Sequence, residues 1–126
     1  MTNLRISEAA EYLGVSDDTV RRWIDSGRLR ATNEKGPTTV SGRDVAHLMR
    51  AASPDMQPRT ASARNSFPGI VIRVERDRVM ALVEVQAGRY RVTSLMSREA
   101  ADELGLEPGV RAVASVKATN VVIELP

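Results

Sequence analysis

The spacing of apolar residues changes once along this 126-residue chain, and that change limits what the chain can fold into. Before residue 51, apolar residues recur at intervals of three and four, which is typical of amphipathic helices. After residue 61 they alternate by two, which is typical of strands. The stretch between them has two prolines, small polar residues and no apolar period. The sequence therefore predicts an α+β protein with a helical domain over 1–50, a linker over 51–61 and a β domain over 62–126.

Composition excludes several classes of protein. With no cysteine and one histidine, a single chain cannot build a disulfide framework or a usual Cys/His zinc site. No apolar run approaches the roughly 20 residues of a membrane helix and no signal peptide is visible, so we expect a cytoplasmic protein without a membrane partner. No acid–base pair, metal-ligand set or nucleophile with a base can be assembled, so we expect neither enzyme activity, nor a cation site, nor an organic cofactor.

The first 50 residues have the spacing of a helix-turn-helix domain. Ser7 is expected to cap a first helix that ends at Gly14, and Ser16 to cap a second helix two residues later. Residues 28–40 predict two short strands joined by a tip, which together form a wing, and a third helix follows from Ser41. A second helix set across the first in this way can enter the major groove of DNA.

The stretch LRISEAAEYLGVSDDTVRRWIDSGRL resembles the DNA-binding heads of MerR-like and excisionase-like regulators. In that family the second helix contacts bases and the wing contacts phosphates. The resemblance therefore implies groove contacts from Thr19, Arg21 and Arg22, and backbone contacts from Arg28, Arg30 and Lys35. An interaction module that uses the same three-helix shape is the alternative. A net charge of only +2 does not decide between them.

Five short segments of strand type follow the linker, and a helix begun by Ser97 interrupts them after the third. This arrangement predicts an OB-like five-stranded β-barrel. Both faces of the sheet carry apolar residues, so one face is expected to fill the barrel and the other an interface between chains. The five segments are Gly69–Glu75, Arg78–Val85, Arg89–Met96, Val110–Val116 and Asn120–Leu125.

Polar residues of the β domain favour an anionic ligand over single-stranded nucleic acid. Phe67 and Tyr90 are its two aromatic residues, too few to stack a series of bases. Basic and hydroxyl side chains gather in residues 62–65, at Ser97 and in residues 117–119. Guanidinium, ammonium and hydroxyl groups, together with the amides at a helix start, suit a compact tetrahedral dianion.

Three motifs in order, SARN, MSREAADELGLEPG and VKATNVVIEL, resemble the molbindin family of molybdate-binding domains, also called the transport-associated OB (TOBE) domain. The resemblance implies that Ser62 and Arg64 hold the oxyanion from one chain, with the backbone of Ala63 contributing. Lys117 and the amide of Ala118 would contact it from a neighbouring chain. Ser97 matches a threonine that is usual in the family.

The sequence departs from the family pattern at two positions. Ala100 stands where the family commonly has a second hydroxyl residue, and Ala118 stands where some members have serine. Loss of one hydrogen bond to a charged oxygen costs on the order of 1.5 to 3 kcal/mol. Each of Arg64, Ser97 and Lys117, taken singly, also fits a structural role, as an ion pair, a helix cap and an exposed strand charge. Asn65 is interpreted as structural, fixing the start of the first strand through backbone bonds.

Together these features predict a molybdate- or tungstate-binding, DNA-binding regulator of molybdenum homeostasis. We expect a homo-oligomer, as a dimer, trimer or hexamer, with the ligand sites between chains. The alternative is a molybdate storage or buffering protein whose helix-turn-helix head serves docking or oligomerisation. DNA affinity distinguishes the two hypotheses.

Overall fold

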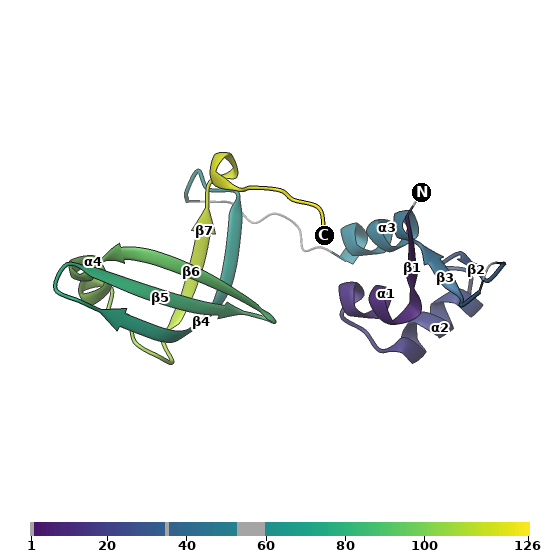
Figure 1. Cartoon of the computed structure of the whole chain (residues 1–126), viewed down its shortest axis with the longest axis horizontal. Coiled ribbons are helices and arrows are strands. Elements are labelled where there is room, and N and C mark those ends of the chain that lie inside the picture. Colours follow the sequence, from purple (N-terminus) through teal and green to yellow (C-terminus); the bar gives the residue numbers. More distant parts are fainter. Residues whose placement is uncertain (1, 35, 53–59) are drawn as a thin grey trace. The chain divides into compact units, whose positions relative to one another are not determined.

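Residues 2–34, 36–52 and 60–126 are described in the computed structural model of the chain (Figure 1). The chain divides into two units, Met1–Gln57 and Pro58–Pro126, called here the head and the sheet unit. Each unit has its own hydrophobic core, drawn entirely from its own residues. Most of the expected linker falls on residues 53–59, outside those described. None of the helices in the described ranges is long and apolar enough to cross a membrane.

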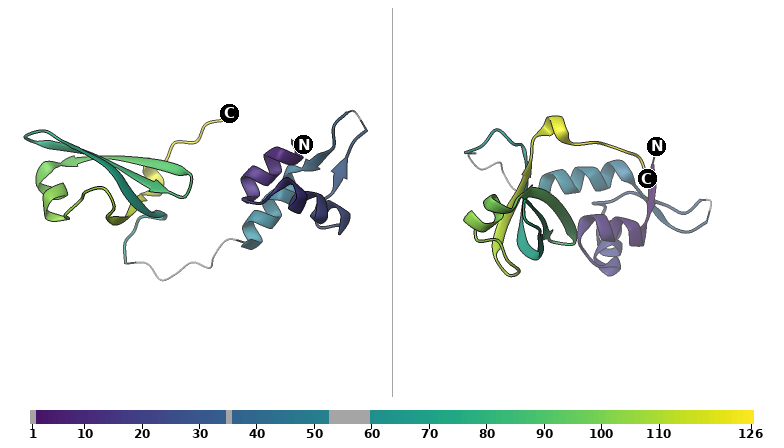
Figure 2. Two further views of the ribbon diagram at one scale, coloured as in Figure 1. Left: turned by 90° about the horizontal axis from the view of Figure 1, so that it is seen from below. Right: turned by 60° about the vertical axis from the view of Figure 1, so that its left-hand side comes forward.

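The head has the predicted order of helix, turn, helix, wing and helix, with one short strand added before the first helix. β1 and β2 both pair with β3 in an antiparallel sheet of order β1-β3-β2. Figure 2 shows the wing, formed by β2, β3 and their connection, projecting from the helices. The elements are β1 (Asn3–Arg5), α1 (Ile6–Leu13), α2 (Asp17–Asp25), β2 (Ala31–Thr32), β3 (Thr39–Ser41) and α3 (Gly42–Ala52).

Local capping explains where the first two helices begin and end. Ser16 caps α2 as predicted, because its Oγ accepts the Thr19 N–H at 3.1 Å. Gly14 ends α1 with a φ of 71°, a left-handed conformation that glycine adopts without steric cost. The expected cap at Ser7 is wrong. The N-cap is Arg5, two residues earlier, so the helix begins at Ile6, and the Glu8 carboxylate accepts the Arg5 N–H at 3.0 Å.

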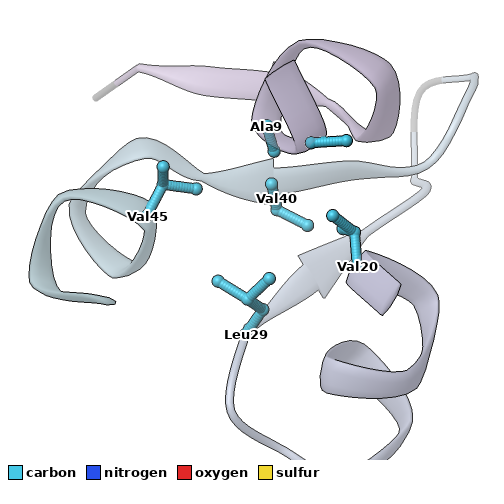
Figure 3. Packing of buried hydrophobic residues seen from close by; sticks show 6 residues of the cluster. Ala9, Val20, Leu29, Val40 and Val45 are labelled. Atoms are coloured by element: carbon cyan, nitrogen blue, oxygen red, sulfur yellow. The ribbon is translucent and has the colours of Figure 1, made fainter. Parts of the chain in front are cut away.

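Small aliphatic side chains from three helices and the sheet form the core of the head. Figure 3 shows Val40 at the centre, with Leu29, Val20, Val45 and Ala9 around it. Leu29 is the largest side chain of this cluster and is 1% exposed. The buried residues are Ala9, Ala10, Val20, Leu29, Val40 and Val45.

The sheet unit is a curled antiparallel sheet of four strands in the order β6-β5-β4-β7. A short helix, α4, follows β6 and buries Ala101 in the core. The α+β class and the curled OB-like sheet are therefore as predicted. The elements are β4 (Asn65–Arg76), β5 (Met80–Ala87), β6 (Tyr90–Ser97), α4 (Arg98–Glu103), β7 (Arg111–Val116) and a 3₁₀ turn η1 (Ala118–Asn120).

Strand β4 connects the two halves of the sheet because it changes partner along its length. Asn65 to Ile70 pair with β7, and Ile70 to Arg76 pair with β5, with an irregularity between Val71 and Arg73. At the change-over Gly69 lies so close to β5 that a Cβ there would be 2.2 Å from the Gln86 carbonyl oxygen. The curl therefore depends on a residue without a side chain.

The expected fifth strand, Asn120–Leu125, is wrong for a single chain. The η1 turn redirects the chain after β7, and residues 121–126 continue without pairing to the sheet. Val122, Ile123 and Leu125 are 83%, 83% and 90% exposed. In the described part of the chain this apolar segment is therefore left largely exposed.

Candidate oxyanion site and candidate DNA-binding face

Sheet pairing brings two of the three polar segments to one end of the sheet unit. Asn65, the first residue of β4, pairs with Val116, the last residue of β7. The Asn65 side-chain amide also donates to the Val116 carbonyl oxygen at 3.1 Å, which agrees with its interpretation as structural. Residues 62–64, which precede Asn65, therefore lie beside Lys117 and Ala118, which follow Val116. One chain thus brings together two segments that the resemblance assigned to neighbouring chains. Figure 1 shows this end of the unit at the η1 turn.

These five residues are accessible and offer several hydrogen-bond donors. Ser62, Arg64, Lys117 and Ala118 are exposed, and Ala63 is half-buried. Lys117 precedes η1, and its carbonyl oxygen accepts the Asn120 N–H at 2.9 Å, which fixes the backbone there. Within the described part of the chain no carboxylate pairs with the Lys117 ammonium. Its charge is therefore available to an anion.

Ser97 lies at the other end of the sheet. It pairs with Met80 at the start of β5, and the neighbouring Ala81 pairs with Arg76 at the end of β4. The 12 residues of β4 thus separate Ser97 from residues 62–64, about 35 Å along the strand. Figure 1 shows α4, which Ser97 begins, far from η1. One chain therefore does not bring all the expected oxyanion-binding residues together.

The amides behind Ser97 are not all free, contrary to expectation. Ser97 Oγ accepts the Ala100 N–H at 3.1 Å and so caps α4. The Arg98 N–H donates to the Val79 carbonyl oxygen at 2.8 Å, because α4 packs against the start of β5. Nearby, Asp102 pairs with both Arg76 and Arg98, at 2.9 and 3.5 Å, which offsets the positive charge at this end. The local geometry at Ser97 supports a structural role.

Helix α2 carries the three residues expected in the DNA groove. Arg21 and Arg22 are exposed and Thr19 is half-buried. The Thr19 hydroxyl contacts Ser16 Oγ and accepts a hydrogen bond from Arg22 Nη2, both at 3.0 Å. Arg21 lies 3.4 Å from the Asp18 carboxylate on the same helix. Surface contacts of this kind are weak, so both arginines can exchange them for DNA.

The basic residues expected at the wing have other contacts. The Arg28 guanidinium stacks on the Trp23 ring, 5.0 Å from its centre, beside a hollow lined mainly by apolar residues. Arg30 donates two side-chain hydrogen bonds and one backbone hydrogen bond to Asp44, at 2.8 to 3.1 Å. These bonds hold the pKa of the Asp44 carboxyl below its ordinary value. Arg30 thus ties the wing to α3, and Lys35 lies outside the described residues.

Two family models match this chain and together cover most of it. One, described as the TOBE domain, matches residues 61–123, half of the chain. The chain belongs to the TOBE domain family. The other, described as a helix-turn-helix domain, matches residues 4–53. The resemblance of the second half to the TOBE domain is therefore confirmed, and so is the helix-turn-helix domain of the first half.

Curated relatives match about half of this chain. Molybdenum-pterin-binding protein 2 of Clostridium pasteurianum is 38% identical over 63 residues, which are 49% of this chain and 93% of that one. A probable molybdenum-pterin-binding protein of Haemophilus influenzae is 41% identical over 63 residues, 49% of this chain and 91% of its own. Their names describe binding proteins.

Solved structures agree with the fold of the sheet unit. The cytoplasmic molybdate-binding protein ModG, with molybdate bound, is 39% identical with a TM-score of 0.52, covering 54% of this chain and 49% of its own. A molybdate-binding protein from Sporomusa ovata shares the fold, with 24% identity and a TM-score of 0.51, covering 53% of this chain and all of its own.

Among the residues that the structure describes, no group of three or more His, Asp or Glu side chains is placed to hold a metal cation.

Proposed function

We propose that this protein binds molybdate or tungstate at sites between its chains and uses that binding to control how its helix-turn-helix heads attach to DNA. One observation carries the ligand site. The pairing of Asn65 with Val116 puts Ser62–Arg64 beside Lys117–Ala118, so both polar segments that flank the sheet lie at one exposed end. The molybdate-binding protein ModG and the molybdenum-pterin-binding relatives support the identity of the ligand.

The chemistry of this end suits a tetrahedral dianion. Arg64 and Lys117 supply positive charge, the Ser62 hydroxyl can donate, and the amides of Ala63 and Ala118 add backbone donors. Molybdate and tungstate have the same charge and nearly the same size, so these donors serve both. Sulfate is smaller, and donors set for the larger ions would stand too far from its oxygens to bond well.

Placing the sites between chains accounts for two features. A site that includes Ser97 together with Lys117 takes one of them from a second copy, because β4 separates them within one chain. Strands β6 and β7 each have one neighbour in the sheet, so each offers an open edge. The exposed apolar segment Val121–Leu125 suits such an edge on another copy, where it would become a fifth strand.

Control of DNA attachment requires that the anion distinguish between arrangements of the heads. A ligand with equal affinity for two arrangements of the heads does not change their populations. A ligand that binds one arrangement better shifts the population toward that arrangement. A ligand shared between chains meets this condition, because it binds only the assembled form fully. Two or more heads held on one DNA also gain affinity through effective concentration.

Calorimetric titration with molybdate tests the site, with sulfate as the reference anion. Lys117→Ala and Arg64→Ala are each expected to weaken molybdate binding about 10- to 100-fold, the value of a hydrogen bond to a charged group. Arg111→Ala is the matched control, since it removes the same charge from an exposed residue at the far end of β7. Equal effects of all three substitutions would contradict a defined site.

DNA-shift assays with and without molybdate test the regulatory half of the proposal, and native mass spectrometry gives the number of chains and bound anions. The proposal expects DNA binding that changes with molybdate. Because each proposed site lies between chains, it also expects bound anions in assemblies of two or more chains and none on single chains. Saturable molybdate binding without affinity for any duplex would refute the regulator and favour storage.

A further inference from the structure

The head carries a polar strip on the outer face of its three-stranded sheet. Arg5 pairs with Thr39, and Thr39 pairs with Thr32, so these residues stand in one row across the sheet. Directly paired residues point to the same face, and the face alternates along each strand. Leu4 and Val40, the next row, pack in the core. Arg5, Thr39 and Thr32 therefore point outward, and so does Asn3, two residues before Arg5.

This strip, defined as Asn3, Arg5, Thr32 and Thr39, forms one side of an open hollow of about 470 Å³ between β1 and the wing. Asn33, Glu34 and Pro37 of the wing complete its lining. The Arg5 main-chain N–H is already bonded to Glu8, but its side chain remains exposed. No carboxylate in residues 2–34, 36–52 or 60–126 pairs with the Arg5 guanidinium.

The donors of the strip match those that contact a nucleic-acid backbone. A guanidinium, two hydroxyls and a carboxamide are the side-chain groups that most often bond phosphate oxygens and fix a protein on a duplex. Glu34 is the one carboxylate of the lining, and it lies in the turn of the wing rather than on the strip. The strip itself thus carries net positive charge.

The other arginines of the wing region are committed elsewhere. Arg30 is bonded three times to Asp44, and Arg28 is stacked on Trp23. Neither side chain lines the hollow. Among the described residues that line the hollow, Arg5 is therefore the one with a positive charge.

We propose that the polar strip binds the sugar–phosphate backbone of duplex DNA, with Arg5 as its charged contact and Asn3, Thr32 and Thr39 as neutral donors. The inference rests on the proposed function, and it assigns backbone contact to β1 and the outer face of the sheet instead of to Arg28 and Arg30. A backbone contact carries no base preference, so its effect is expected to be the same on every sequence.

Fluorescence anisotropy tests this inference. The 126-residue chain is titrated, with molybdate present, into labelled duplexes of two unrelated sequences at a series of salt concentrations. The logarithm of the DNA association constant falls linearly with the logarithm of the salt concentration, and each phosphate contact makes this slope steeper by about 0.9. Arg5→Gln is expected to make that slope shallower by about 0.9 per bound head and to weaken binding equally on both duplexes. Thr39→Val is expected to weaken binding with the slope unchanged, and Arg5→Lys to keep the slope.

Arg50→Gln is the matched control, because Arg50 is exposed in the last turn of α3 and lies outside the strip. It removes the same charge and should leave the slope as in the unchanged protein. Circular dichroism establishes that each variant keeps its helices. If the unchanged protein binds duplex DNA and Arg5→Gln binds with the same affinity and slope, the strip is not a backbone contact. If the unchanged protein binds no duplex, the proposed function fails as well.

Discussion

Replacing Leu29 with alanine should unfold the head while leaving the sheet unit intact. Leu29 is 1% exposed and is the bulkiest member of a six-residue core whose other members are alanines and valines. Figure 3 shows it beneath Val40, in one cluster with side chains of the helices and the sheet. A buried Leu→Ala change costs about 2 to 5 kcal/mol through lost transfer free energy and the cavity left behind.

That cost is comparable with the whole stability of the head. Small domains have roughly 0.05 to 0.15 kcal/mol of unfolding free energy per residue, so a unit of about 50 residues has on the order of 3 to 8 kcal/mol. We expect the midpoint of head unfolding to fall sharply, with much of the variant unfolded near body temperature.

The single tryptophan makes the measurement specific. Trp23 is half-buried against the head core, so its fluorescence during urea unfolding reports the head alone. Leu104→Ala, at a residue of the sheet unit that is 67% exposed, is the matched control and should not move the Trp23 transition. Molybdate binding by calorimetry should survive in Leu29→Ala while DNA binding is lost. A loss of less than about 1 kcal/mol in the Trp23 transition, or simultaneous loss of molybdate binding, would refute this reasoning.

Two further predictions concern the sheet curl and the wing. Gly69→Ala should destabilise the sheet unit by about 3 kcal/mol. The new Cβ would lie 2.2 Å from the Gln86 carbonyl oxygen, so the backbone would have to move. A thermal melt that matches that of the unchanged protein would contradict the close approach. Asp44→Asn should lower head stability near neutral pH, because the Arg30 hydrogen bonds hold the Asp44 pKa below its ordinary value. A depressed carboxyl pKa stabilises the folded state above the unfolded pKa of about 3.9, and this contribution is lost as pH falls through the folded value. The stability difference measured by Trp23 fluorescence should therefore shrink below about pH 4, and a difference independent of pH would show that the Asp44 charge is not its source.

Local signals predicted the helices and most strands correctly. Ser16 and Gly14 mark helix ends through bonds to residues a few positions away, and such bonds are visible in the sequence. Alternation located four strands of the sheet unit to within a few residues. The structural interpretation of Asn65 also agrees, since its side chain bonds the neighbouring strand.

Features that depend on distant partners were not predicted. The hydrogen bonds from the Arg30 guanidinium to Asp44, 14 residues away in the sequence, were not predicted. The segment 120–125 has a strand pattern, yet a pattern does not say whether its partner is in the same chain. Arg5 was missed because its exposure depends on the pairing of β1 with β3, which no local signal near Arg5 indicates.

The position of the proposed oxyanion site in the sequence offers a route from ligand to DNA. Helix α3 of the head ends at Ala52, and Ser62 follows ten residues later as the first proposed ligand contact. An anion held by Ser62 and Arg64 therefore fixes the end of the segment that joins the two units, which restricts the arrangements open to the head. Such coupling is reciprocal, because the factor by which molybdate changes DNA affinity must equal the factor by which DNA changes molybdate affinity. Titrating molybdate with and without bound duplex measures that factor, and a factor of one would mean that the two sites are not coupled.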